Sequence, residues 1–528
     1  MKKRITLFAF LTLFATLILS SCSIFDDFVR PTGSTTSTTS TNTHPTTSNH
    51  STSSTSSGDS DGFDYLGTGR KILDDALSEE AMSDIGVGIP STGNRKALVI
   101  PVAFKTYTSR RGKSYGGFKS ADFNKIEPAF NGTSEETGFQ SVKSFYQVSS
   151  NGLLNIDFDV TDVVNLRGNF MDYQNVADDA GTRDIVNEAL EALDSSIDFS
   201  QYDTNNDGSI DGVYIVYSVP YGGSPNENGI SSTPGYNEDF WWAWVDWMLD
   251  DSVTVDGVKA NYFMWGSADF LNDAYIQGGD DYINVNALTF IHETGHMLGL
   301  DDYYDYDYDY DYSFRGGLQV TGFIGGVGGA DIMDATVGDQ TPISKILLGW
   351  ETPTIVTESG TYNLVSLQDE MGEGQHHILL IPKNWNDSYF SEYYLVDFYT
   401  PTGLNALHKG HNGLFSEEGV RIYHIDATVS SREGKQFDKK YWTFFSYNNS
   451  TTDHLFIKLM EGDGDNSLEK LERYQLSTYY PADASNSDLF HAGQSFASTN
   501  TWYDGSEIGY TISVDSIADG VATVTITK

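Results

Sequence analysis

The sequence predicts an α+β protein, in which a twisted sheet covered by helices is followed by a C-terminal region resembling a β-sandwich. Two observations support this division. Up to about residue 352, apolar runs alternate with segments of helical periodicity. Beyond it, short Tyr-, Val- and Ile-rich runs are separated by Gly, Asn, Asp and Ser. We therefore expect one folded domain over residues 96–352 and a β-rich region over 353–528.

Buried strands are expected in the first domain where apolar residues are continuous or alternate, at residues 97–104, 153–160 and 213–219. Pro101 interrupts the first of them, since proline cannot donate to a sheet ladder. Helices are predicted over residues 140–148 and from Thr182, a plausible N-cap, to Leu193. The clearest strands of the C-terminal region are at 392–399, 419–425, 508–514 and 521–526.

The N-terminus predicts export. A short basic stretch and an apolar run lead to Leu19-Ser20-Ser21-Cys22, so residues 1–21 are expected to be a signal peptide. The end of this segment resembles a bacterial lipobox, which implies lipid attachment to Cys22 and a place on the extracellular face of the bacterial cell membrane, with shedding as a further option. An ordinary signal peptide or an uncleaved anchor helix are the alternatives.

A flexible tether is expected after Cys22, because residues 22–62 are rich in Ser and Thr and hold too little apolar surface to fold. Residues 63–95 form a segment before the first domain, and whether it is a propeptide stays open. Cys22 is the single cysteine, so a lipidated chain would contain no disulfide.

The formal net charge of −43 argues against a nucleic-acid partner and against electrostatic docking on anionic lipid. A membrane contact is then expected through the lipid anchor alone, and we expect a monomer.

The segment NALTFIHETGHMLGLDDYY (286–304) carries the chemistry. His292 and His296 are four residues apart, so on a helix capped by Asn284 or Asn286 they face the same side and can bind one Zn²⁺. Glu293 would face the metal-activated water as general base. A helix with an ordinary histidine pair is the alternative.

The residues after this helix extend the pattern. Gly299 would end the helix and turn the chain, so that Asp302 returns as a third zinc ligand; Asp301 and Asp305 are competitors. Met333, after a glycine-rich run, is a candidate for the methionine that lies beneath the ligands in metzincin-type sites.

At this point the chain resembles the immune inhibitor A-like bacterial metallopeptidases. The resemblance rests on HETGHMLGLDDYYD (292–305), DIMD (331–334) and PISKILLGW (342–350), with support from residues 141–156 and 203–218. It implies a zincin or metzincin-like fold and a secreted zinc endopeptidase that cleaves protein or peptide substrates. The implied ligands are His292, His296 and Asp302, with Glu293 as base. The Tyr-Asp run at 301–312 departs from the family, and Ala335 occupies a position where some metzincins have an oxyanion-stabilising tyrosine.

A calcium site is a second expectation. Asp203, Asn205, Asp207 and Asp211 follow the spacing of an EF-hand-like loop, but Tyr214 replaces the usual bidentate glutamate. A plain surface turn is the alternative. The acidic run at 301–311 could also hold a cation, although a solvated loop is favoured.

A different class of function is also open. A surface binding protein or adhesin could be built on a degenerate peptidase scaffold, and a metal hydrolase could act on something other than peptides. The intact His292, Glu293 and His296 argue against both. The histidines of the β-rich region are expected to be core or surface residues.

Overall fold

The computed structural model describes residues 81–83 and, from 88 to 528, those outside gaps at 109–111, 113, 175–179, 220–223, 227–228, 232–242, 249–251, 273–284, 305–308, 312–318, 322–325, 335–336, 387, 411–413, 434–440, 450–453, 466–467, 469–470, 475–477 and 482–483. The expected signal peptide, Cys22 and tether lie outside these residues. Within the described part of the chain, no helix combines the length and apolar character needed to cross a membrane.

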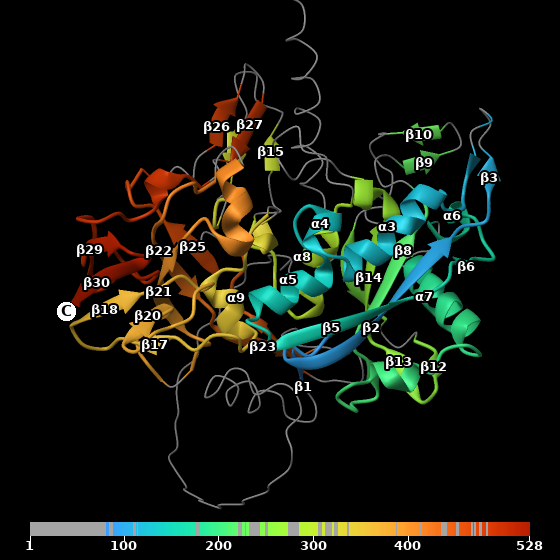
Figure 1. Ribbon diagram of the computed structural model, residues 1–528, viewed down its shortest axis with the longest axis horizontal. Coiled ribbons are helices and arrows are strands. Elements are labelled where there is room, and N and C mark those ends of the chain that lie inside the picture. Colours follow the sequence, from blue (N-terminus) through green and yellow to red (C-terminus); the bar gives the residue numbers. More distant parts are fainter. Residues whose placement is uncertain are drawn as a thin grey trace, which may run out of the picture.

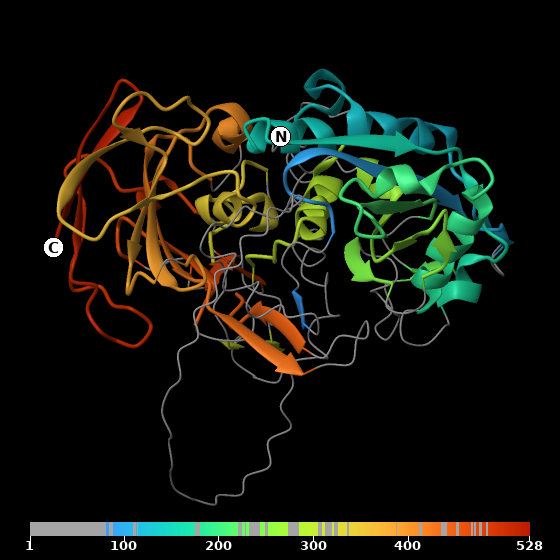
Figure 2. The same ribbon diagram turned by 90° about the horizontal axis from the view of Figure 1, so that it is seen from below.

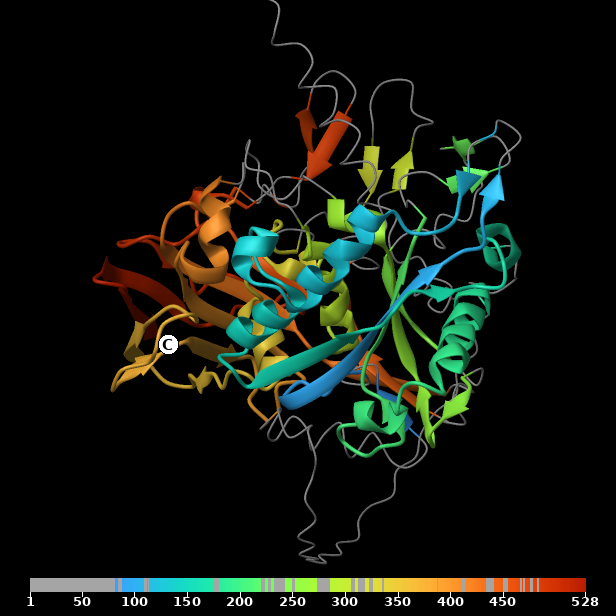
Figure 3. The same ribbon diagram turned by 45° about the vertical axis from the view of Figure 1, so that its right-hand side comes forward.

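The first region is built on a mixed sheet with the strand order β11-β14-β8-β2-β5, and β6 also pairs with β2 (Figure 1). The pairs are parallel except at the edge, where β11 runs antiparallel to β14. Its twist is visible in Figure 3, where the blue and teal strands β2 and β5 run side by side. The strands are β2 (Gly93–Ala103), β5 (Leu154–Val160), β6 (Val164–Asn165), β8 (Val213–Tyr217), β11 (Trp244–Trp247) and β14 (Tyr262–Ser267).

Helices cover both faces of this sheet (Figure 2). Neighbouring residues of a strand point to opposite faces, so Ala97 and Val99 join one buried cluster while Leu98 and Ile100 join another. The first cluster includes side chains of three helices, α3 (Ser120–Asn131), α5 (Val142–Ser149) and α8 (Leu288–Met297). The second includes α7 (Ala180–Leu193). Helix α8 therefore lies on the same face of the sheet as α3 and α5.

Most predicted elements of this region are confirmed, with one wrong detail. Thr182 does not cap α7, because the helix already begins at Ala180 and Thr182 is buried inside its first turn. Pro101 is tolerated inside β2 for a topological reason. The pairing of β2 with β5 ends at Val99 and its pairing with β6 starts at Val102, so Pro101 lies where one neighbour replaces the other.

The C-terminal region contains two five-stranded sheets, ordered β17-β20-β21-β22-β25 and β19-β18-β30-β29-β28. Apolar side chains from both sheets form one buried cluster, which is how two sheets pack face to face. The predicted strand at 508–514 is displaced, since β29 begins at Thr511. The strands are β17 (Thr354–Ile355), β18 (Gly360–Leu364), β19 (Gln375–His376), β20 (Ile378–Pro382), β21 (Glu392–Tyr399), β22 (Gly419–Asp426), β25 (Ile457–Met460), β28 (Ser495–Phe496), β29 (Thr511–Ala518) and β30 (Val521–Thr527).

The two regions share a core. The buried cluster around α5 and α8 continues through α9 (Pro342–Leu347) into side chains of β21, β22 and β25. Figure 1 shows α5, α8 and α9 between the two sets of sheets. The predicted boundary at residue 352 therefore crosses continuous apolar packing.

The segment before the first domain also packs on the fold. The amide of Ile89 donates to the carbonyl of Met297 (2.9 Å), and Trp350 Nε1 donates to the carbonyl of Ser91 (2.7 Å). Strand β1 (Ala81–Ser83) pairs in parallel with β24 (Tyr441–Phe445), which pairs with β23 (Val429–Glu433). The remaining short elements are α4 (Ser134–Thr137), α6 (Phe170–Gln174), β3 (Tyr107–Thr108), β4 (Ser114–Tyr115), β7 (Ser209–Ile210), β9 (Ser224–Asn226), β10 (Gly229–Ser231), β12 (Thr254–Val255), β13 (Val258–Ala260), β15 (Asp309–Asp311), β16 (Gln319–Thr321), β26 (Leu471–Tyr474) and β27 (Thr478–Pro481).

Candidate metal centre

Helix α8 is fixed at its start and along its length. The N-cap position of α8 is Ala287, so the predicted cap at Asn286 lies one residue too early, although the Asn286 side chain accepts a hydrogen bond from the amide of Leu288 (2.9 Å); Asn284 lies outside the described residues. The hydroxyl of Tyr146, from α5, donates to the carbonyl of Ile291 (2.7 Å). The Tyr146 contact joins α8 to α5.

The helix ends in the turn predicted for Gly299. Gly299 has φ +92°, a left-handed conformation that favours glycine. Its amide donates to the carbonyl of His296 (2.9 Å), and the amide of Leu300 donates to Gly295 (3.0 Å). These two bonds form a Schellman motif, which reverses the chain directly after the helix.

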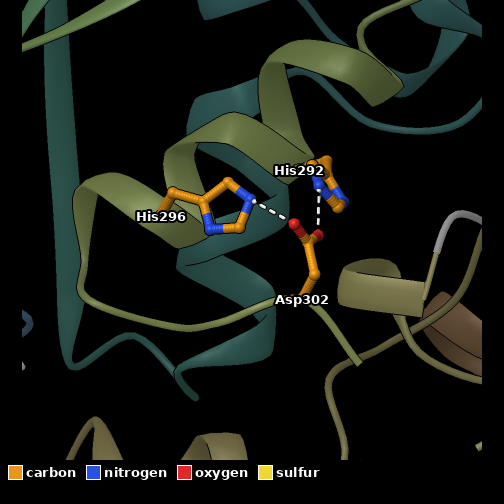
Figure 4. Close-up of side chains that lie close together, drawn as sticks. All are labelled: His292, His296 and Asp302. Carbon is orange, nitrogen blue, oxygen red and sulfur yellow. Dashed lines mark ion pairs between the residues drawn. The ribbon is translucent and has the colours of Figure 1, made fainter. Parts of the chain in front are cut away.

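The turn brings a carboxylate to both histidines (Figure 4). Asp302 Oδ1 lies 2.9 Å from His292 Nε2, and Asp302 Oδ2 lies 3.3 Å from His296 Nε2. These three side chains form a group with metal-ligating geometry, which does not include Asp301. Asp305 lies outside the described residues. The geometry thus favours Asp302 among the three candidates.

The second nitrogen of each histidine is held by the backbone. His292 Nδ1 donates to the carbonyl of Ile332 (2.7 Å), and His296 Nδ1 donates to the carbonyl of Leu300 (2.7 Å). Such bonds orient an imidazole and place its Nε2 lone pair toward a metal. Both imidazoles are therefore prepared to bind through Nε2.

Without a metal, the two imidazoles hold protons and the Asp302 carboxylate stays ionised. Burial alone would raise the pKa of Asp302, but the two adjacent imidazoles lower it well below its usual range. Burial alone would lower the pKa of His296, but the Asp302 carboxylate raises it to about 10. The pKa of His292 is raised for the same reasons. Metal binding must then release protons from the imidazoles.

Glu293 lies beside this group with a carboxylate that is almost fully buried, at 4% exposure. Its Oε2 atom has no hydrogen-bond partner among the described residues. Burial raises the pKa of Glu293 to about 7, against the opposing effect of the two histidines.

Ligand atoms of a tetrahedral zinc lie roughly 3.3 Å apart, given bonds of about 2.0–2.1 Å. The donor set and its spacing therefore fit zinc.

Met333 packs against α8 at Gly295. A Cβ atom on Gly295 would lie only 2.3 Å from Met333 Sδ, so the glycine allows the methionine to pack directly under α8. Asp331 holds the Met333 turn by accepting from the Met333 amide (2.6 Å). Neither Gly295 nor Asp331 was anticipated in these roles, because neither contact follows from local spacing. Ala335 lies outside the described residues.

The EF-hand-like loop satisfies its acidic groups internally. Asp203 accepts from the amides of Asp207 and Gly208 (both 2.9 Å), and Asp207 accepts from the amide of Ser209 (2.7 Å). Asp211 accepts from the side chain of Thr204 instead of turning toward the others. The metal-ligating groups found in the described part of the chain do not include this loop. The calcium expectation, which also named Asn205, has no support here.

The described histidines of the β-rich region contact protein groups. His376 pairs with Thr354 (2.8 Å), His377 with Glu351 (3.0 Å) and His424 with Glu392 (3.0 Å). His408 is buried between the Tyr399 hydroxyl (2.8 Å) and the carbonyl of Val337 (2.6 Å), the latter in the first region. These contacts agree with structural roles.

The sequence was also compared with models of known protein families. Residues 108–325 match the family model described as immune inhibitor A peptidase M6, catalytic domain. The predicted family resemblance is confirmed. The match includes His292, Glu293, His296 and Asp302, and it ends before Met333. A comparison with curated proteins found no significant match.

The M6 match identifies a metallopeptidase domain. The mixed sheet with its covering helices fits such a domain. A peptidase acts on protein or peptide substrates, and a metallopeptidase needs a metal. The three side chains on α8 and its following turn form the described group best suited to hold it, because they combine imidazole and carboxylate donors.

Proposed function

We propose that this chain is a zinc-dependent endopeptidase with a metzincin-like catalytic domain, a β-sandwich C-terminal region and a lipid anchor at Cys22. The observation that carries the proposal is the convergence of His292 Nε2, His296 Nε2 and the Asp302 carboxylate beside the buried Glu293. A scaffold without activity would not be expected to keep all four groups in this arrangement.

The residues divide the work as follows. His292, His296 and Asp302 would hold zinc, which when bound polarises a carbonyl oxygen and lowers the pKa of water. Glu293 would take a proton from the attacking water and pass it to the leaving amine. Ile332 and Leu300 keep the imidazoles aligned through their carbonyls.

The proposal also includes where the protein is located in the cell. Lipidation of Cys22 would hold the catalytic domain on the extracellular face of the bacterial cell membrane, with residues 22–62 as tether. Labelling cells with a radioactive or clickable fatty acid tests this, since a Cys22→Ser variant should lose the label and be released.

The catalytic proposal is tested by Glu293→Gln. This variant keeps the three metal ligands and removes the base, so it should bind zinc like the wild type. Its cleavage of unfolded casein should fall by about 10²–10⁴-fold. Equal cleavage by both proteins, or no zinc in the wild type, would contradict the proposal and favour a surface binding protein on a peptidase scaffold.

A further inference from the structure

A second group of metal-ligating side chains lies in the C-terminal region. Glu461 and Asp463 follow the end of β25, and Asp488 ends a short helical turn, η12 (Asn486–Asp488). One carboxylate oxygen from each lies within 4.8 Å of the others. Glu461 and Asp488 are buried, with 8% and 1% exposure, while Asp463 is exposed. We call these three residues the acidic cluster.

One oxygen of the acidic cluster accepts no hydrogen bond from the part of the chain that the structure describes. Asp488 Oδ2 accepts hydrogen bonds from the amide (2.7 Å) and hydroxyl (3.2 Å) of Ser485. Asp488 Oδ1 is buried and has no hydrogen-bond partner among the described residues. A buried carboxylate oxygen without a donor is costly, because its hydration is lost and not replaced. Such an oxygen is stabilised by a proton, a water molecule or a cation.

The charges around Asp488 also favour a bound cation. Burial raises the pKa of Asp488 to about 6; the hydrogen bonds from Ser485 oppose this, and the charges of Glu461 and Asp463 add to it. Lys458 also interacts with Glu461 electrostatically. Three carboxylates therefore converge at this point, with Lys458 nearby.

Backbone contacts hold the cluster together. The amide of Gly462 donates to the carbonyl of Asp488 (2.9 Å), so the loop after β25 is joined to η12. Glu461 accepts from the amide of Leu468 (3.2 Å), and Asp463 accepts from that of Asp465 (2.9 Å). The three carboxylates therefore belong to segments that are hydrogen-bonded to one another, not to independent surface loops.

We propose that Glu461, Asp463 and Asp488 bind a hard divalent cation of the calcium class. Carboxylate oxygens are the preferred ligands of Ca²⁺, at about 2.3–2.6 Å, so two oxygens on one ion lie at most roughly 5 Å apart. A set of oxygen donors without nitrogen or sulfur does not favour zinc. The proposal is independent of the zinc site in its residues and in its test.

A cation here would also brace the catalytic region. The two segments that carry the cluster meet Gly328, where an added Cβ would lie 2.7 Å from both Leu468 Cδ2 and the Ala484 amide nitrogen. The Ala484 amide also donates to the Gly328 carbonyl (2.7 Å). Shortly after Gly328 comes Ile332, whose carbonyl holds His292. Calcium should therefore stabilise the fold through a contact that reaches the metal centre.

The test uses the full chain, loaded with zinc and exchanged into calcium-free buffer. Addition of CaCl₂ alone should raise Tm, and titration calorimetry should report its affinity. Asp463→Asn and Asp488→Asn should each weaken calcium binding at least tenfold. Asp463 is exposed, so its variant tests the site even if Asp488→Asn does not fold.

Asp207→Asn, in the EF-hand-like loop, is the matched control and should bind calcium like the wild type. Three results would overturn the proposal: no calcium binding by the wild type, unchanged binding by both cluster variants, or loss of binding in Asp207→Asn. Because none of these measurements uses peptidase activity, failure here is distinct from failure of the catalytic proposal.

Discussion

The two regions of the molecule differ in how they place buried carboxylates. In the catalytic region, Glu293 has a buried oxygen without a hydrogen-bond partner among the described residues. In the β-rich region, buried charges are paired with one another, as Asp397 is with Arg421 and Glu392 with His424. The comparison teaches that buried polar atoms without protein partners indicate a catalytic or binding site. Buried polar atoms with partners indicate a role in stability. By this criterion the acidic cluster resembles the catalytic region, although it lies in the β-rich one.

The comparison first predicts a loss of activity without a loss of fold for His296→Ala. This variant should lose stoichiometric zinc, and its kcat/KM should fall by more than the roughly 10²–10⁴-fold expected for loss of the base alone. The metal-free variant should unfold at a somewhat lower urea concentration than the metal-free wild type, because Asp302 keeps His292 as a buried partner but loses His296. His424→Gln is the control from the other region, and it should retain both zinc and kcat. Zinc loss in His424→Gln would break the comparison.

The second prediction concerns the buried pair of the β-rich region. Asp397 is fully buried and accepts from Arg421 Nε (3.1 Å), with a second contact through Nη2. Asp397→Asn leaves the guanidinium with a neutral partner, so unfolding free energy should fall by about 3–5 kcal/mol. The remaining folded protein should keep its zinc and its kcat.

The double variant Asp397→Leu/Arg421→Met separates pairing from packing. Replacing both charges by apolar groups should restore most of the lost stability in urea unfolding, since a buried pair contributes little net free energy. A double variant as unstable as the single one would mean that the pair is needed for packing as well.

The third prediction tests the contact beneath the zinc helix. Gly295→Ala would force Met333 from its position, at a cost of about 1–3 kcal/mol. Met333→Ala alone should cost about 2–5 kcal/mol by leaving a cavity. Together the two changes should cost less than their sum, because the new methyl group enters the space left by the methionine. Additive costs would show that the two residues do not share this contact.

The parts of the site that sequence could reveal are those encoded within a few residues. His292, His296, Gly299 and Asp302 lie on one helix and its following turn, so their spacing determines their convergence. The strand predictions succeeded for the same reason, because alternation is local. The core shared across residue 352 and the convergence of Glu461 with Asp488 depend on chain segments brought together by the fold. The calcium site predicted from the spacing of Asp203 to Asp211 has no support in the structure, where local backbone amides bond to Asp203 and Asp207.

The smallest effect is expected at the junction of the two regions, where His377 pairs with Glu351 (3.0 Å) and also donates to the carbonyl of Asp369 (2.8 Å). Burial alone would lower the pKa of His377, and Lys345 acts in the same direction, but the hydrogen bond to the Glu351 carboxylate raises it above the ordinary value. A histidine whose pKa is raised by folding stabilises the protein fully below its unfolded pKa of about 6.5. That contribution is lost as pH rises through the pKa of His377 in the folded protein.

The difference in unfolding free energy between wild type and His377→Gln should therefore be largest near pH 6, at about 1–2 kcal/mol, and shrink toward pH 9. Urea unfolding at a series of pH values measures it, and Glu351→Gln should give the same trend. A difference that grows with pH would mean that the neutral imidazole is the stabilising form, and that this pair joins the two regions by packing alone.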